Sequence, residues 1–182
     1  MTFKNVIKPI LVLTAICLFV AILLSVVNYF ASPVIADATA EAERKARSDA
    51  LPGATEFSEV DLSGYADLPE NVSACYRDDG GSGYVFLVKG EGYGKKSAPI
   101  TLLVGIKSDG KIAGIKITDV SGETAGIGDK VKKNDFTSRF VGLGAEAEVS
   151  AVENVSGATY SSTGVKQGVR DALLVFGILT TD

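Results

Sequence analysis

The chain has 182 residues and a formal net charge of −4, and it contains two cysteines and no histidine. This length leaves room for one domain beyond a short anchor. Without histidine there is no histidine-based acid–base catalysis and no histidine metal site, and two isolated cysteines supply neither an iron–sulfur ligand set nor a haem-attachment motif. No basic cluster with interleaved aromatic residues suggests nucleic acid. Any redox chemistry of this chain must therefore use an organic cofactor.

An apolar segment near the N-terminus predicts a transmembrane helix. No charged residue occurs from Pro9 through Ala36, and residues 10–30 are almost wholly apolar. About 20 helical residues are enough to cross a bilayer core of roughly 30 Å. We therefore expect a single-pass membrane anchor within residues 1–31.

The charges that flank this segment predict its orientation. Lys4 and Lys8 precede it, and the first charge after it is the acidic Asp37. This bias places the N-terminus in the cytoplasm and the chain from about Ser32 outside. The alternative is a cleaved signal peptide, because Val34-Ile35-Ala36 has the small-residue cleavage pattern, although the apolar run is longer than a typical signal core.

The following residues predict a helix and then a domain of short strands. Residues 33–50 are alanine-rich and charged, which favours a juxtamembrane helix within residues 32–52, and Leu51-Pro52-Gly53 ends it. Residues 53–182 then form the extracytoplasmic domain. Turn residues separate its predicted strands, and Ser108-Asp109-Gly110 is a strong hairpin signal. The predicted strands are 56–60, 74–77, 83–89, 100–107 and 111–120.

The C-terminal region predicts an amphipathic helix from Val165 to Phe176, with apolar residues at steps of three to four. A cluster of hydroxyl residues and the small Gly157 and Ala158 precede it. A helix start exposes unpaired backbone N–H groups and a partial positive charge, so a phosphate could dock there. The alternative is an ordinary helix cap formed by Ser161, Ser162 or Thr163 behind a small-residue turn.

Residues 153–159 read Glu-Asn-Val-Ser-Gly-Ala-Thr. This stretch resembles the motif Asp-x-x-Ser/Thr-Gly-Ala-Thr/Ser of membrane flavoproteins that carry FMN on a threonine, namely the G subunits of Rnf complexes and the C subunits of sodium-pumping NADH:quinone reductases. Glu153 stands in place of the usual aspartate. The resemblance implies that FMN is esterified through its phosphate to Thr159 by a separate flavin transferase acting on FAD. Thr55 also follows Gly-Ala, but it lacks the preceding serine and the helix start, so we interpret it as part of a turn.

Two further segments extend the resemblance over most of the predicted domain. Gly92-Tyr93-Gly94 is similar to a glycine-tyrosine-glycine turn of the family, and residues 123–128 are similar to its Glu-Thr-Pro-Gly-Leu-Gly loop, with Ala125 in place of the proline. Such a loop can approach a flat ring closely, giving backbone donors to the flavin carbonyls and Ile127 as a packing surface. The alternative is a plain glycine turn before a predicted helix over residues 130–140.

We therefore expect an α+β fold, with a single N-terminal transmembrane helix and an FMN-binding domain that has a twisted, mostly antiparallel sheet and packed helices. The resemblance implies a cofactor site with two ends, and no catalytic residue or metal ligand. The expected phosphate end comprises Ser156, Gly157, Ala158, Thr159, Ser161 and Ser162. The expected ring end comprises Glu123, Thr124, Gly126, Ile127 and Gly128.

The function implied is electron relay in the cell membrane. An Rnf-type complex couples electron transfer between ferredoxin and NAD to ion transport, so the implied partners are its integral membrane flavin-bearing subunits, its iron–sulfur subunits and the flavin transferase. No GxGxxG fingerprint follows a strand, so we do not expect NADH to bind this chain. Two alternatives remain at this point. One is a stand-alone anchored flavoprotein for extracellular electron transfer, and the other is a non-redox anchored binding module, which would be colourless.

Overall fold

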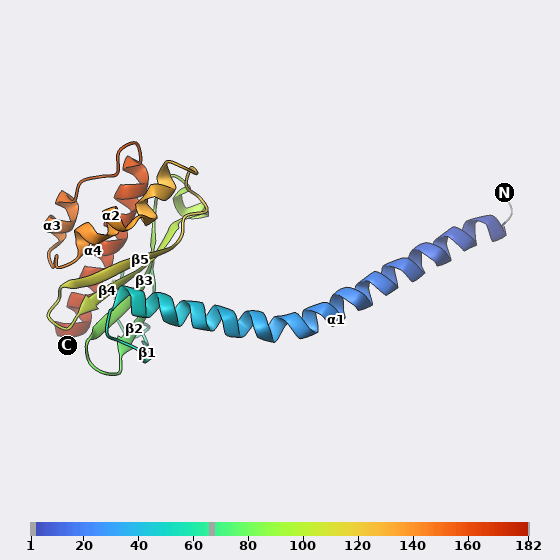
Figure 1. The fold of residues 1–182 in the computed structure, drawn as a ribbon, viewed down its shortest axis with the longest axis horizontal. Coiled ribbons are helices and arrows are strands. Elements are labelled where there is room, and N and C mark those ends of the chain that lie inside the picture. Colours follow the sequence, from blue (N-terminus) through green and yellow to red (C-terminus); the bar gives the residue numbers. More distant parts are fainter. Residues whose placement is uncertain (1–2, 66–67, 182) are drawn as a thin grey trace. The chain divides into compact units, whose positions relative to one another are not determined.

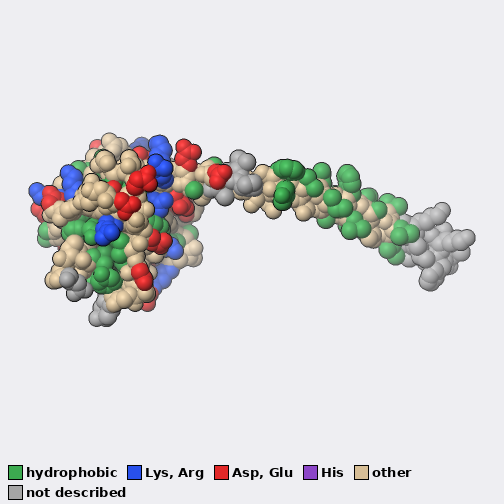
Figure 2. Space-filling model, turned by 90° about the horizontal axis from the view of Figure 1, so that it is seen from below, with side chains coloured by type: hydrophobic (Ala, Val, Ile, Leu, Met, Phe, Trp, Pro, Cys, Tyr) green, Lys and Arg blue, Asp and Glu red, His purple; other side chains and the backbone are tan. Residues whose placement is uncertain are grey.

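The computed structural model describes residues 3–65 and 68–181, and the chain divides into two compact units, residues 1–43 and 44–182. Helix α1 (Phe3–Ala50) contains the apolar segment (Figure 1). It is long and apolar enough to cross a membrane, and its large apolar side chains from Ile10 to Phe30 are exposed. Hydrophobic side chains lie along the apolar part of this helix, whereas charges of both signs lie on the domain (Figure 2).

Helix α1 passes without a break through residues 32–33, where the sequence suggested separate transmembrane and juxtamembrane helices. It ends where expected. The N–H of Leu51 still bonds the carbonyl oxygen of Arg47 at 2.9 Å, and then Pro52 and Gly53, which has a φ of +98°, turn the chain away. A positive φ of this size is one that glycine adopts at little cost.

The domain contains one antiparallel sheet of five strands in the order β1-β2-β3-β4-β5. Each strand pairs with the next one in sequence, as short turns such as residues 108–110 predict, and Gly110 has a φ of +82°. All five predicted strands are present, and the α+β expectation is confirmed. The strands are β1 (Phe57–Val60), β2 (Val72–Asp78), β3 (Gly83–Gly90), β4 (Ile100–Lys107) and β5 (Ile112–Asp119).

Both faces of the sheet are covered. Helix α4 (Thr159–Thr181) packs on one face, where its apolar positions meet side chains such as Phe86 and Val104. On the other face Ala50 and Leu51 pack with Val85 and Leu103. Burial on two sides explains why β3 and β4 are nearly continuous apolar runs rather than alternating ones.

The helix predicted over residues 130–140 is wrong. The segment forms three short pieces, η2 (Gly128–Lys132), α2 (Asn134–Thr137) and η3 (Ser138–Phe140). Lys133 separates η2 from α2, because its backbone is extended, with φ −69° and ψ 141°. In one continuous α-helix Val131 would lie about 140° around the axis from Phe136. The interruption lets both side chains, and Phe140, enter the same core.

The C-terminal helix is longer than predicted. Helix α4 begins at Thr159 and not near Val165, so the cluster of hydroxyl residues belongs to its first turn. The predicted apolar face, from Val165 to Phe176, is buried against the sheet. A further short helix that the sequence did not suggest, α3 (Glu146–Ala151), precedes the turn that leads into α4.

Candidate functional site

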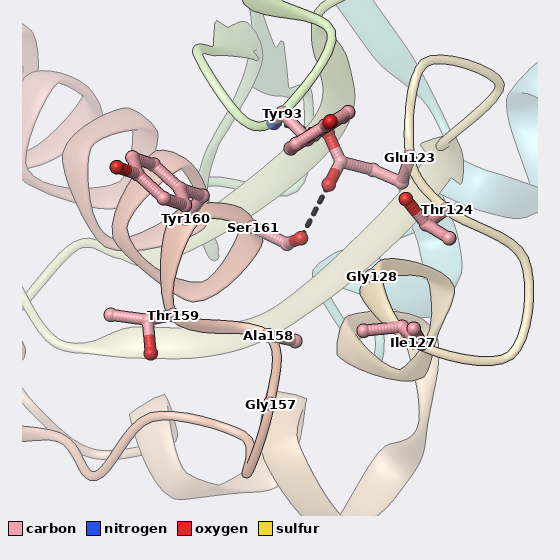
Figure 3. Close-up of a pocket in the computed structure, with 10 residues that line it drawn as sticks. All are labelled: Tyr93, Glu123, Thr124, Ile127, Gly128, Gly157, Ala158, Thr159, Tyr160 and Ser161. Carbon is pink, nitrogen blue, oxygen red and sulfur yellow. Dashed lines mark hydrogen bonds between the residues drawn. The ribbon is translucent and has the colours of Figure 1, made fainter.

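A cavity of about 260 Å³ lies between the loop that follows β5 and the first turn of α4 (Figure 3). Residues from three separate segments line it, because the sheet and α4 bring the ends of β3 and β5 beside the start of the helix. The lining residues are Tyr93, Glu123, Thr124, Ile127, Gly128, Gly157, Ala158, Thr159, Tyr160 and Ser161.

The turn before α4 leaves Thr159 at the rim of this cavity. Gly157 has a φ of +78°, a conformation that favours glycine, and its place at the turn reverses the chain into the helix. The carbonyl oxygen of Ala158 then accepts the first helical hydrogen bond, from the N–H of Ser162 at 2.9 Å. Thr159 is therefore the first residue of the helix, and its side chain is exposed.

The start of α4 also presents backbone donors. The first N–H groups of an α-helix have no acceptor inside the helix, and no described residue accepts a hydrogen bond from the N–H of Thr159, Tyr160 or Ser161. These donors lie at the positive end of a 23-residue helix dipole. The arrangement suits an anionic oxygen-rich group beside Thr159.

The two adjacent serines of this turn have different partners. Ser162 is fully buried, and its Oγ accepts the N–H of Val155 at 3.0 Å and donates to the carbonyl oxygen of Ala158 at 2.8 Å. Ser161 is also buried, but its Oγ donates to Oε2 of Glu123 across the cavity (Figure 3). Ser161 thus joins α4 to the loop, and Ser162 holds the turn beneath Thr159.

The other oxygen of Glu123 binds the turn after β3. Its Oε1 accepts the N–H of Tyr93 at 2.8 Å and that of Gly94 at 3.5 Å. One carboxylate therefore connects the Gly92-Tyr93-Gly94 turn, its own loop and α4. Side chains with exposed apolar surface surround this polar centre, since Tyr93 is 67% exposed, Ile127 46% and Tyr160 75%.

The structure brings most of the proposed cofactor residues together. Eight of them line the cavity: Glu123, Thr124, Ile127, Gly128, Gly157, Ala158, Thr159 and Ser161. Three do not. Ser156 lies one residue before the lining segment, Ser162 is buried beneath it, and a Cβ on Gly126 would point into open space.

Two lining residues were not proposed from the sequence, Tyr93 and Tyr160. Tyr160 follows Thr159 directly in the sequence, and this adjacency to the proposed attachment residue is the signal that could have identified it. The signal for Tyr93 is the pair of flanking glycines, which let the backbone come close to a carboxylate.

Comparison with known proteins is consistent with this geometry. Residues 92–174 match the family model described as FMN-binding domain, and this range contains every residue that lines the cavity. The chain is 27% identical over 171 residues to the G subunit of the proton-translocating ferredoxin:NAD(+) oxidoreductase complex of Clostridium ljungdahlii, covering 88% of this chain and 86% of the relative. It is 30% identical over 179 residues to the G subunit of the ion-translocating oxidoreductase complex of Methanosarcina acetivorans, covering 93% and 94%.

The two alignments cover 88% and 93% of this chain, which is more than the matched domain alone. The motif around Thr159, the loop from Glu123 and the matched domain all lead to the same assignment. The chain belongs to the family of Rnf-type complex G subunits and contains an FMN-binding domain.

Proposed function

We propose that this chain is an electron-relay subunit of a membrane-bound, ion-translocating oxidoreductase complex and carries FMN esterified through its phosphate to Thr159. The observation that carries the proposal is the position of Thr159. Its exposed side chain begins α4 at the rim of the cavity, next to three N–H groups that no described residue binds.

The residues around the cavity fit the two chemical ends of FMN. The helix start and the small Gly157 and Ala158 suit the phosphate, because they offer donors and partial positive charge without bulk. The opposite wall offers Thr124 and Ile127, a hydroxyl and a branched aliphatic side chain, to the ring system. FMN, when bound, would supply the capacity to accept and release electrons.

The size of the cavity supports a relay role. Pockets that bury a whole drug-sized ligand typically have volumes of roughly 300–1,000 Å³, whereas this one has about 260 Å³. A bound flavin would remain partly exposed between Tyr93, Ile127 and Tyr160. Exposure favours electron exchange with a partner protein, and a covalent bond prevents loss of the cofactor to the medium.

The proposed partners are the other membrane subunits of the complex and the flavin transferase that modifies Thr159. The names of the two relatives specify complexes that move protons or ions, and we propose ion-coupled electron transfer for this chain on that basis. The domain is proposed to lie outside the cytoplasm, because two lysines precede the apolar segment and Asp37 follows it.

Production of the full chain together with its flavin transferase tests the covalent bond. The intact mass should increase by one esterified FMN, and flavin fluorescence should persist in a denaturing gel. Thr159→Ala should abolish both signals. Thr55→Ala is the matched control, because Thr55 also follows Gly-Ala and is exposed but lies after the turn at Gly53. Covalent fluorescence that survives in Thr159→Ala would refute the attachment site.

A further inference from the structure

The Glu123 carboxylate is the point at which the three walls of the cavity meet. Its two oxygens accept hydrogen bonds from the N–H groups of Tyr93 and Gly94 and from the hydroxyl of Ser161 (Figure 3). These donors lie about 30 residues before it and 38 residues after it in sequence. Because both oxygens already have protein partners, the side chain is held in one position before any ligand binds.

Two glycines leave the space that this carboxylate occupies. A Cβ on Gly128 would lie 2.7 Å from Oε2 of Glu123 and 2.7 Å from Oγ of Ser161, and a Cβ on Gly92 would collide with Oε1. Real Cβ atoms essentially never approach other atoms this closely. The backbone on both sides is therefore shaped around the carboxylate, and any other residue at either glycine would displace it.

The negative charge of Glu123 is not neutralised by a neighbouring cation. Within residues 3–65 and 68–181, no ion pair joins it to a lysine or arginine. Two of its partners are backbone N–H groups, which can only donate, and the third is the hydroxyl of Ser161. The first turn of α4 favours an anion at this place. A fixed, unpaired negative charge thus lies on the wall of the cavity.

We propose that Glu123 is a positioning residue that holds the walls of the flavin site and whose charge lowers the reduction potential of the bound flavin; this inference rests on the proposed function. A bound flavin that accepted an electron without a proton would gain one unit of negative charge. The carboxylate on the cavity wall would repel that charge, because Coulomb energy is large where water is partly excluded. Removal of the charge makes reduction easier.

Three variants separate the two roles. Glu123→Gln keeps the shape and an acceptor oxygen but removes the charge. Glu123→Ala removes both the charge and the hydrogen bonds. Glu148→Gln is the matched control, because Oε2 of Glu148 also accepts two backbone N–H groups, from Gly144 at 2.9 Å and Ala145 at 3.1 Å, but Glu148 does not line the cavity.

Two measurements on the full chain in detergent test the proposal. The first is hydrogen–deuterium exchange of the peptide that contains Tyr93 and Gly94, in protein made without flavin transferase. Exchange should be faster than wild type in Glu123→Ala and close to wild type in Glu123→Gln. The second is the midpoint potential of the flavin-loaded protein. It should shift to more positive values in Glu123→Gln and remain unchanged in Glu148→Gln.

Either measurement can overturn its part of the proposal. Unchanged exchange in Glu123→Ala would show that the carboxylate does not hold the turn at Tyr93. An unchanged or more negative potential in a fully loaded Glu123→Gln protein would show that the charge does not lower the potential. Failure of the proposed function is distinguishable, because wild-type protein would then carry no flavin on Thr159 while the exchange result for the apo-protein would still decide the positioning role.

Discussion

The backbone N–H of Val155 donates a 3.0 Å hydrogen bond to the buried hydroxyl of Ser162, seven residues further along the chain. The same hydroxyl donates to the carbonyl oxygen of Ala158 at 2.8 Å. One side chain from the first turn of α4 thus fixes both ends of the segment that precedes Thr159. These two hydrogen bonds hold Thr159 in a defined position at the start of the helix.

Ser162→Ala should destabilise the domain by about 1–3 kcal/mol, because it leaves the partly buried N–H of Val155 without an acceptor. It should also reduce the fraction of chain that receives FMN, since the turn that carries Thr159 loses its support. Thermal or urea unfolding and intact mass measure the two effects. Thr163→Ala changes an exposed hydroxyl in the same turn, and its effect should stay within about 0.5 kcal/mol. Equal effects of the two substitutions would contradict this role of Ser162.

Gly126→Ala should affect mainly the stability of the domain, whereas Gly128→Ala should affect mainly the flavin site. Gly126 has a φ of +75° and open space around its Cβ position, so Gly126→Ala should cost about 1–2 kcal/mol of stability from the backbone alone. Gly128→Ala places a methyl group 2.7 Å from both Glu123 and Ser161. It should separate these two residues and alter the absorption spectrum of the loaded flavin.

The measurement is the flavin spectrum at equal covalent loading, with unfolding followed in parallel. A spectrum that changes in Gly126→Ala but not in Gly128→Ala would reverse the assignment of which glycine lies at the ring end of the site.

Gly164→Ala should impair the packing of α4 on the sheet. A Cβ at this position would lie 2.6 Å from the carbonyl oxygen of Glu91, a backbone atom that cannot rotate away. We expect a loss of about 1–3 kcal/mol, as for other overpacked sites. Gly177 lies in the same helix, is exposed and has no atom within 4 Å of its Cβ position. Gly177→Ala should therefore stabilise the domain by about 0.5–1 kcal/mol. Denaturant midpoints decide the comparison, and similar midpoints for the two variants would exclude this close approach.

A reporter fused after Asp182 should be active only if it functions outside the cytoplasm, because the flanking charges predict an external domain. The native thiol of Cys75 does not offer a simpler test. It is fully buried, and burial raises its pKa to about 12, so a thiol reagent cannot reach a reactive thiolate in the folded protein. Activity of a reporter that works only in the cytoplasm would reverse the proposed orientation.

The sequence by itself determined the elements whose signals are local. Continuous apolar character marked the N-terminal helix. Turn residues such as Asp109 and Gly110 separated strands that pair with their neighbours, and the spacing from Val165 to Phe176 marked the buried face of a helix. The resemblance of residues 153–159 to a known motif also indicated the family and FMN.

Only the tertiary structure decided which residues meet. The segment around residues 130–140 breaks because Val131 and Phe136 must both enter one core, and helical periodicity along the chain contains no information about that core. Ser161 and Ser162 are adjacent and identical in type, yet one binds Glu123 and the other holds the turn. Adjacent residues of a helix point about 100° apart, and which of the two meets Glu123 depends on the packing of α4 on the sheet, that is, on contacts between residues far apart in sequence.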